Sequence, residues 1–272
     1  MKKKDFAIIG CLMAFSGALT SCSNTSDKAT LKFDEYHGSA AYSLLNTASL
    51  RGQDTDAVYA DSVSLVLPLK LGACDVKALR DTITAYALNQ TGKPIAASVD
   101  TWLDATASDL GYKTERTKKV NPYTADGFTV VSGFIANMTP EMLVYCVRNE
   151  SYMVRAAHGM TTRRYINYLM RDGGKVLSLD DLFTAEGLAA LPSRIAEQAQ
   201  AMSDMIGQTS IDALPENKNY YISSESEIVL SYQPYEVASF AQGTIDIPFY
   251  PYELVDYMTP QAITLFHLED LK

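Results

Sequence analysis

The N-terminal residues predict which part of the chain remains to fold, because they have the pattern of a cleaved signal peptide. Lys2, Lys3 and Lys4 form a positive start, and residues 6–19 form an apolar run too short to remain as a membrane span. The sequence Leu19-Thr20-Ser21-Cys22 follows, with a bulky apolar residue three places before the cysteine and small residues between them. A lipoprotein signal peptidase requires this pattern before it cuts ahead of an acylated cysteine. We therefore predict a lipoprotein signal peptide over residues 1–21, lipidation of Cys22 and a short tether over residues 22–29.

The alternative is an ordinary secretory signal with an incidental cysteine. Both kinds of signal place the mature chain outside the cytoplasm, and lipidation would also hold it on a membrane. Each buried CH₂ of an acyl chain contributes about 0.8 kcal/mol, so two or more chains anchor a protein stably. Ser23 stands where an aspartate commonly retains lipoproteins at the inner membrane. We expect a location in the cell envelope, on the periplasmic face or at the outer membrane.

The net charge excludes some classes of partner. The sequence has 23 basic and 32 acidic residues, and removal of residues 1–21 takes away three lysines and one aspartate. The remaining charge is about −11, which disfavours binding to nucleic acid or to an anionic lipid surface. It would accelerate the encounter with a cationic partner. The basic cluster over residues 113–119 is interpreted as a solvated linker, with a binding patch as the alternative.

The four cysteines of the sequence allow one possible disulfide in the mature chain. Cys11 would depart with the signal peptide and Cys22 would carry lipid, so Cys74 and Cys146 remain. An oxidising compartment permits a disulfide between them, provided that their Cα atoms approach within about 7 Å. Two separately buried thiols are the alternative.

Hydrophobic periodicity predicts an α+β fold. Period-two alternation indicates half-buried strands, whereas helix caps followed by apolar residues three and four apart indicate helices. Residues 51–56 read as a loop, residues 172–175 as a turn and residues 178–183 as a capped helical turn. The expected strands are 32–45, 62–70, 128–134, 143–147, 161–170 and 245–249, with a hairpin over 220–232. The expected helices follow caps at Asp75 and Ser98, start at Pro192, and cover 235–240 and 252–257.

These elements suggest antiparallel sheets with helices packed on one side. We expect two consecutive α/β halves that share one compact unit. The first is an N-terminal accessory half over residues 30–138, and the second is a C-terminal domain over residues 139–272.

Several segments of the second half follow one another in a familiar order. They are Arg155–Gly159, Tyr165–Asn167, Gly174–Lys175, Leu179–Phe183, Tyr232–Gly243, Ile247–Pro248 and Leu254. Together they resemble the RsiV-type extracellular domain family, which occurs in the lysozyme-sensing anti-sigma factor RsiV and beside the catalytic domain of the peptidoglycan deacetylase PdaC. Residues 30–135 resemble more weakly the accessory half that precedes this domain.

The resemblance implies a non-catalytic envelope domain that meets other macromolecules. The binding residues that it suggests are His158, Tyr232, Gln233, Tyr235 and Glu236. The chain departs from the family at Arg155 and Ala156, where a Gly-Gly pair is usual. A lipidated cysteine would also replace the membrane helix of the anti-sigma factors, so control of a sigma factor is not expected.

The sequence lacks the common catalytic, metal and cofactor motifs. It has three histidines, no His-Glu-x-x-His, no Cys-x-x-Cys, no Gly-x-Ser-x-Gly and no glycine-rich phosphate loop. His158 is a general-base candidate if a carboxylate lies within reach, and otherwise a structural histidine of a turn. Asp180 and Asp181 are either paired acids or helix-capping residues. Glu236 suits either the first turn of a short helix or a binding role.

Tyrosine pairs such as Tyr220/Tyr221, Tyr232/Tyr235 and Tyr250/Tyr252 favour either recognition surfaces or packing at sheet edges. Trp102, the single tryptophan, lies on an expected core face.

Three hypotheses follow. The favoured one is a non-enzymatic, lipid-anchored binding or sensing domain for an envelope or host macromolecule, either a lysozyme-like protein or cell-wall glycan. The second is a glycan- or peptidoglycan-modifying hydrolase that uses His158. The third is a purely structural envelope lipoprotein.

Overall fold

A computed structural model describes residues 31–43, 57–109, 121–207 and 210–272. The predicted loop over residues 51–56, the basic cluster, the signal peptide and Cys22 lie outside these ranges. The N-terminal part contains β1 (Leu31–Ser43), β2 (Val58–Leu71), α1 (Lys77–Leu88), α2 (Ile95–Asp109), the 3-10 helix η2 (Pro122–Thr124), β3 (Gly127–Met138), β4 (Met142–Tyr152), β5 (Met160–Leu169) and β6 (Lys175–Leu177).

The C-terminal part is built from short elements. These are α3 (Leu179–Leu182), α4 (Ala185–Ala201), α5 (Ser203–Ile206), η3 (Glu216–Lys218), β7 (Tyr220–Ile222), β8 (Ile228–Tyr232), η4 (Phe240–Gln242), β9 (Ile245–Phe249), η5 (Pro251–Tyr257), α6 (Pro260–Leu265) and η6 (Glu269–Leu271). Among the helices of the described ranges, none combines the length and the apolar character that crossing a membrane requires.

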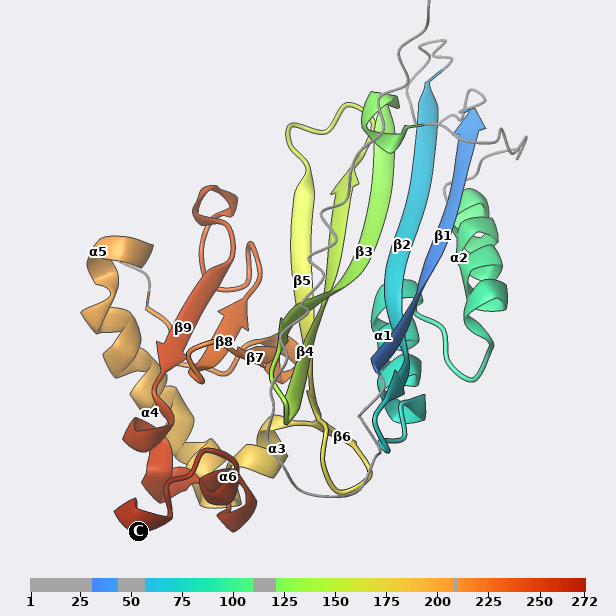
Figure 1. Ribbon diagram of the computed structural model, residues 1–272. Coiled ribbons are helices and arrows are strands. Elements are labelled where there is room, and N and C mark those ends of the chain that lie inside the picture. The colour runs from blue at the N-terminus through green and yellow to red at the C-terminus, as the bar shows by residue number, and fades with distance from the viewer. Residues whose placement is uncertain (1–30, 44–56, 110–120, 208–209) are drawn as a thin grey trace, which may run out of the picture.

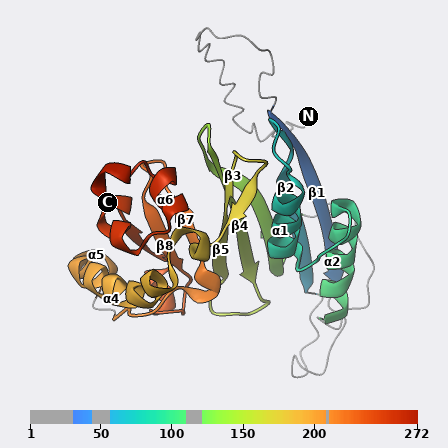
Figure 2. The same ribbon diagram turned by 90° about the horizontal axis from the view of Figure 1, so that it is seen from below.

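Strands β1 to β6 form one sheet in sequence order, and helices α1 and α2 cover one of its faces (Figures 1 and 2). Every neighbouring pair is antiparallel except β2 and β3. That parallel pair follows from the chain path, because a crossover between parallel strands needs a long connection and the segment with α1 and α2 supplies it. The alternating residues Val63, Leu65 and Leu67 of β2 point into the core beneath these helices.

Strands β7, β8 and β9 form a second, antiparallel sheet. With the C-terminal helices they form a C-terminal unit that lies beside β4 and β5 (Figures 1 and 2). Ile228, Leu230 and Ile247 of this unit belong to the same buried cluster as Val144 of β4 and Leu169 of β5. The six-stranded sheet also runs through the expected boundary at residues 138 and 139, which falls in the turn between β3 and β4.

The structure confirms the α+β class, with antiparallel pairing dominant. Every predicted strand has a counterpart, and β2, β3 and β4 extend beyond their predicted bounds. Residues 44 and 45 of the first predicted strand lie outside the described residues. The hairpin of β7 and β8 turns at residues 223–227 as expected. Asp172, Gly173 and Gly174 form the predicted turn, all with positive φ.

Three helix predictions are wrong. Helix α2 begins at Ile95, and the Ser98 hydroxyl donates back to the Pro94 carbonyl inside the helix instead of capping it. Helix α4 begins after Thr184, whose side chain accepts the N–H of Gly187 and caps the helix. Pro192 therefore lies inside α4 rather than at its start.

The third wrong prediction concerns residues 235–240. Residues 235–239 form turns and bends instead of a helix, because Tyr235 adopts φ +70° and interrupts any helical run, and Phe240 already belongs to η4. Residues 252–257, expected as a helix, lie within the 3-10 helix η5.

The two remaining cysteines are free thiols, so the possible disulfide between Cys74 and Cys146 is not formed. Cys74 packs at the end of β2 against the cluster under α1, close to Gly174. Cys146 is buried in β4 and hydrogen-bonds Tyr165, which packs against the other cluster. Burial raises the pKa of the Cys146 thiol to about 11, which keeps it protonated and unreactive at neutral pH.

Candidate functional site

His158 and Tyr235 meet although they are 77 residues apart in the sequence. His158 lies in the connection between β4 and β5, and Tyr235 lies in the connection between β8 and β9. The Tyr235 hydroxyl and the His158 Nε2 are 2.9 Å apart. Both side chains are exposed, so the contact lies on the surface of the protein.

The hydrogen bonds of His158 fix its tautomer. Nδ1 is 3.0 Å from the carbonyl oxygen of Gly159, and a carbonyl only accepts. Nδ1 therefore carries the proton in the neutral ring, and Nε2 accepts the hydroxyl hydrogen of Tyr235. Phe240 stacks on the imidazole with ring centroids 3.8 Å apart and planes inclined by 15°. We refer to His158, Tyr235 and Phe240 as the His158 cluster.

The segment that carries Tyr235 is held by its own polar side chains. The Gln233 Oε1 accepts the backbone N–H of Arg163 at 2.6 Å, which ties the segment to β5. Glu236 accepts the N–H of Gln233 at 2.7 Å and also that of Glu216. These bonds hold Tyr235 at φ +70°, a conformation that costs free energy in a non-glycine residue. The ring of Tyr235 is thus positioned before any partner arrives.

The structure divides the predicted binding residues into two groups. His158 and Tyr235 are exposed, whereas Gln233 and Glu236 make the local bonds just described. Tyr232 is fully buried, and its hydroxyl donates to the Ala213 carbonyl at 2.6 Å. The expectation that Tyr232 contacts a partner is therefore wrong, because its ring belongs to the core of the C-terminal unit. Phe240 belongs to the segment that carried the resemblance, although the sequence did not single it out.

The His158 cluster offers an aromatic contact surface. Within the described residues, the hydrogen-bond partners of His158 are a carbonyl and a phenol, and neither is a carboxylate. No group of three or more metal-ligating side chains occurs in the same ranges. His158 and Tyr235 are exposed and Phe240 is half-buried, and such packed rings offer a large contact area that loses little conformational freedom on binding.

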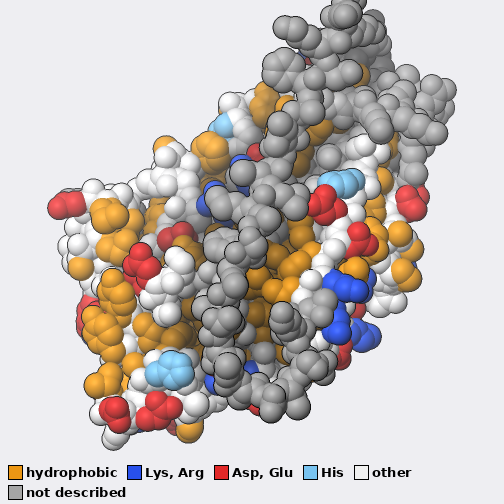
Figure 3. Space-filling model, viewed as in Figure 1, with side chains coloured by type: hydrophobic (Ala, Val, Ile, Leu, Met, Phe, Trp, Pro, Cys, Tyr) orange, Lys and Arg blue, Asp and Glu red, His pale blue; other side chains and the backbone are white. Residues whose placement is uncertain are grey.

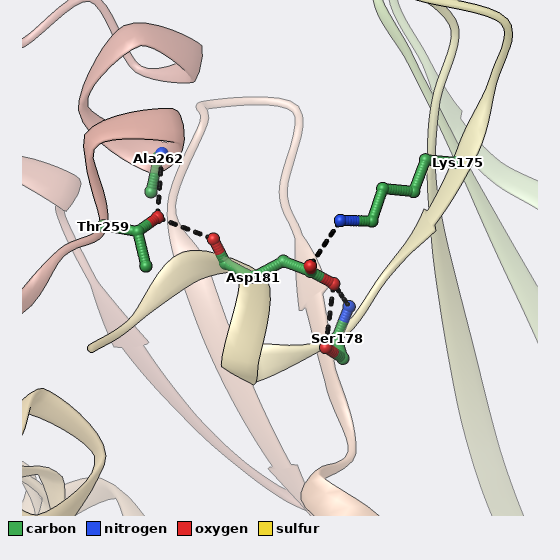
Figure 4. Close-up of polar contacts among 5 residues, drawn as sticks. All are labelled: Lys175, Ser178, Asp181, Thr259 and Ala262. Carbon is green, nitrogen blue, oxygen red and sulfur yellow. Dashed lines mark hydrogen bonds and ion pairs between the residues drawn. The ribbon is translucent and has the colours of Figure 1, made fainter. Parts of the chain in front are cut away.

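Asp180 and Asp181 do not act as a pair. The Asp181 carboxylate accepts the N–H and the hydroxyl of Ser178, each at 2.8 Å, and meets the Lys175 ammonium at 2.5 Å (Figure 4). Ser178 and Asp181 thereby form a capping box at the start of α3. Asp180 instead pairs with Lys218 at 2.7 Å. The capping interpretation of Asp181 is confirmed.

Replacing Asp181 by asparagine is expected to lower the free energy of unfolding at pH 7 by about 1 kcal/mol. Burial alone would raise the pKa of Asp181, but the hydrogen bonds from Lys175 and Ser178 outweigh it and lower the pKa. A lowered pKa stabilises the fold above the ordinary value of about 3.9, and this contribution disappears as the pH falls through the folded-state value. Urea unfolding of both proteins at a series of pH values measures the difference.

The control is Asp172→Asn, because the Asp172 side chain is 90% exposed and should leave stability unchanged. A difference for Asp181→Asn that persists undiminished under acid conditions would show that the charge is irrelevant to the cap.

The comparisons with known proteins identify one family. Residues 180–252 match the family model described as a protein of unknown function, DUF3298, so the chain contains a DUF3298 domain. This region holds Tyr235 and Phe240, whereas His158 precedes it. No curated protein matches the chain.

Two solved structures share the fold. One is a DUF3298 family protein (BF2082) from Bacteroides fragilis NCTC 9343, with a TM-score of 0.61 and 20% identity over 86% of this chain and 96% of that one. The other is a DUF3298 family protein (PA4972) from Pseudomonas aeruginosa PAO1, with a TM-score of 0.58 and 15% identity over the same shares. At these identities the likeness establishes the architecture alone.

Proposed function

We propose that this protein is a lipid-anchored, non-enzymatic binding or sensing domain of the cell envelope, of the RsiV type. The observation that carries the proposal is the His158 cluster, in which the exposed His158 and Tyr235 and the half-buried Phe240 come together from two distant connections. The lipobox at Cys22 supports the anchor, and the DUF3298 domain over residues 180–252 supports the family relationship.

The construction of the cluster explains how it would contribute affinity. Energetically dominant interface residues are enriched in aromatic side chains, and binding is tighter when they are held rigid in the free protein. Tyr235 is 55% exposed, yet the bond to His158 and the turn held by Gln233 and Glu236 restrain it. A partner would therefore bury a preformed ring surface.

The charge of the protein favours a cationic partner protein, of which lysozyme is an example. The net charge is −9 for the whole sequence, and complementary fields raise association rates. The face in Figure 3 shows acidic side chains among exposed hydrophobic ones over the C-terminal unit. Such a mixture suits an interface with apolar contacts at its centre and charged residues at its rim.

Calorimetric titration of the purified full-length chain with lysozyme tests the proposal. Binding should saturate, and Tyr235→Ala should weaken it by about tenfold or more, which corresponds to about 1.4 kcal/mol. His158→Ala should have a similar effect because it removes both the hydrogen bond and the surface on which Phe240 stacks. The matched control is His37→Ala, since His37 is an exposed histidine on β1 whose Nε2 lies 3.4 Å from the Glu35 carboxylate.

Glu236→Ala should also weaken binding, but through release of the segment that positions Tyr235. Its signature would be faster proteolysis of residues 233–243, which Tyr235→Ala should not cause. The absence of binding heat and co-elution at physiological salt would remove lysozyme as the partner. Equal affinity of the Tyr235→Ala variant would remove the cluster as the contact surface.

The hydrolase hypothesis has less support from the geometry, because a general-base role for His158 calls for a carboxylate in contact with the ring. Turnover of peptidoglycan fragments that is lost in His158→Ala, with circular dichroism unchanged, would replace the binding proposal. The structural-lipoprotein hypothesis instead predicts association that rises with protein concentration in light scattering.

A further inference from the structure

A cleft of about 430 Å³ lies where the two sheets of the protein meet. Its walls come from four segments far apart in the sequence. These are the ends of β3 and β4 with their turn, the end of β7 with the turn to β8, the start of η5, and the end of α6 with the residues after it. The residues that line it are Asn137, Thr139, Glu141, Met142, Ile222, Ser223, Ser226, Pro251, Tyr252, Leu265, Phe266, His267 and Leu268. A volume of this size is in the range of small-molecule sites, roughly 300 to 1,000 Å³.

The cleft and the His158 cluster lie at opposite ends of β4. The strand runs from Met142, which lines the cleft, to Tyr152, shortly before His158. Its 11 residues, at about 3.3 Å each, separate the two ends by roughly 35 Å. A ligand in the cleft would therefore not share residues with the surface proposed above.

The floor of the cleft is apolar, and its rim is polar. Met142 and Leu265 are almost completely buried at the bottom, with Phe266 and Leu268 beside them. Two rim hydroxyls already make hydrogen bonds within the turns. The Thr139 hydroxyl accepts the N–H of Met142, and the Ser223 hydroxyl accepts the N–H of Glu227.

Two polar side chains of the rim are unused. Within the described part of the chain, neither the Asn137 amide nor the His267 ring makes a hydrogen bond. Glu141 adds a carboxylate that is 49% exposed and shared with Arg171 at 3.5 Å. An amide and a carboxylate together offer hydrogen-bond donors and acceptors to one ligand.

The rim also presents an aromatic platform. Tyr252 is 56% exposed and stacks on Tyr250, with ring centroids 5.6 Å apart and planes inclined by 11°. The stacking fixes the plane of the Tyr252 ring, so the ring offers a flat apolar surface next to unpaired hydrogen-bonding groups.

We propose that this cleft binds a sugar that carries an acetamido group. The C–H face of a pyranose would stack on Tyr252, and its hydroxyls would bond Asn137 and Glu141. The acetamido methyl would enter the apolar floor over Met142 and Leu265, which a plain hexose would leave unfilled. One small ligand thus satisfies the aromatic platform, the unused Asn137 amide and the apolar floor.

A peptide fits this site less well. An extended peptide gains affinity by pairing its backbone with an exposed strand edge. Only the ends of strands reach the cleft, at Asn137, Met142 and Ile222, and the rest of its walls are turns and helix ends, so they offer no continuous strand edge. An isolated apolar side chain would fill the floor but would leave Asn137 without a partner.

Saturation-transfer NMR with N-acetylglucosamine and its β-1,4 disaccharide tests the assignment on the full chain. The acetyl methyl protons should receive the strongest saturation, because the methyl group lies deepest. Tyr252→Ala and Asn137→Ala should each weaken binding by about tenfold. Both side chains project from rim positions, so the variants should keep the circular dichroism spectrum of the wild type.

Two controls check that the acetamido group and the cleft itself account for the binding. Glucosamine, which lacks the acetyl group, should bind at least about tenfold more weakly than N-acetylglucosamine. Tyr123→Ala should leave sugar binding unchanged, because Tyr123 is 58% exposed but lies before β3, away from the cleft.

Equal binding of glucosamine, or unchanged binding by Tyr252→Ala, would overturn the assignment. Tighter binding of N-acetyl-phenylalanine amide than of the sugar would assign the cleft to a peptide side chain instead. These outcomes are independent of lysozyme binding, which probes the opposite end of β4.

Discussion

Replacing Asn219 by alanine is expected to lower the free energy of unfolding by about 3 kcal/mol. The Asn219 Oδ1 accepts the N–H of Tyr165 at 3.0 Å, and its Nδ2 donates to the carbonyls of Arg163 and Ser231. The side chain thus joins β5 of the first sheet to β8 of the second. Its removal leaves buried backbone groups without partners, and each such group costs about 1–3 kcal/mol.

Asn167 makes a second connection of the same kind. Its Nδ2 donates to the Tyr220 carbonyl at 3.0 Å and its Oδ1 accepts the N–H of Ile222 at 2.9 Å, so it pairs with β7 as a strand would. Asn167 is 1% exposed. Asn167→Leu preserves the volume but removes both bonds, and we expect a loss similar to that of Asn219→Ala.

Guanidinium unfolding followed by circular dichroism measures both losses. Asn149→Ala is the control, because Asn149 is exposed on β4 and should change stability by less than about 0.5 kcal/mol. If Asn219→Ala unfolds at the same denaturant concentration as Asn149→Ala, the two sheets are not joined through this side chain.

Asn167 shows what role the residues behind the family resemblance have in the structure. Asn167 belongs to the segments that carried it, as do Tyr232, Gln233 and Glu236. In the structure all four side chains hold the C-terminal unit together, and His158, Tyr235 and Phe240 remain for contact. A recurring sequence pattern marks structural requirements as well as binding surfaces, and the sequence alone does not separate them.

Strands such as β2 and β9 were predictable because their residues alternate between a buried and a less buried face, as Val63, Leu65 and Leu67 do. Strand β4 was predictable for another reason, since its residues 142–147 form a continuous buried apolar run. The start of α4 was missed because Pro192 resembles a first-turn proline, whereas Thr184 provides the cap and tertiary packing tolerates the proline. The bond between His158 and Tyr235 depends on how two sheets pack, and local periodicity carries no information about that. The cleft could not be predicted for the same reason, because its four walls meet only through the packing of the two sheets and share no sequence motif.

Gly187→Ala is expected to destabilise the protein by about 3 kcal/mol, although alanine favours an isolated helix by about 1 kcal/mol over glycine. A Cβ atom at Gly187 would overlap the carbonyl oxygen of Tyr257 and lie 3.0 Å from its carbonyl carbon. That carbonyl also accepts the N–H of Thr184, so it cannot move without loss of a bond at the start of α4. The steric conflict with fixed backbone therefore outweighs the gain in helix propensity.

Urea unfolding of Gly187→Ala beside Ser193→Ala measures this conflict. Ser193 is exposed on α4, so its replacement should change the free energy of unfolding by less than about 0.5 kcal/mol. Trimming the partner in the double variant Gly187→Ala/Tyr257→Leu should not restore stability, because the contact involves the Tyr257 backbone rather than its ring. A Gly187→Ala protein as stable as the wild type would mean that α4 does not pack this closely against η5, and the C-terminal unit would then require a different arrangement of its helices.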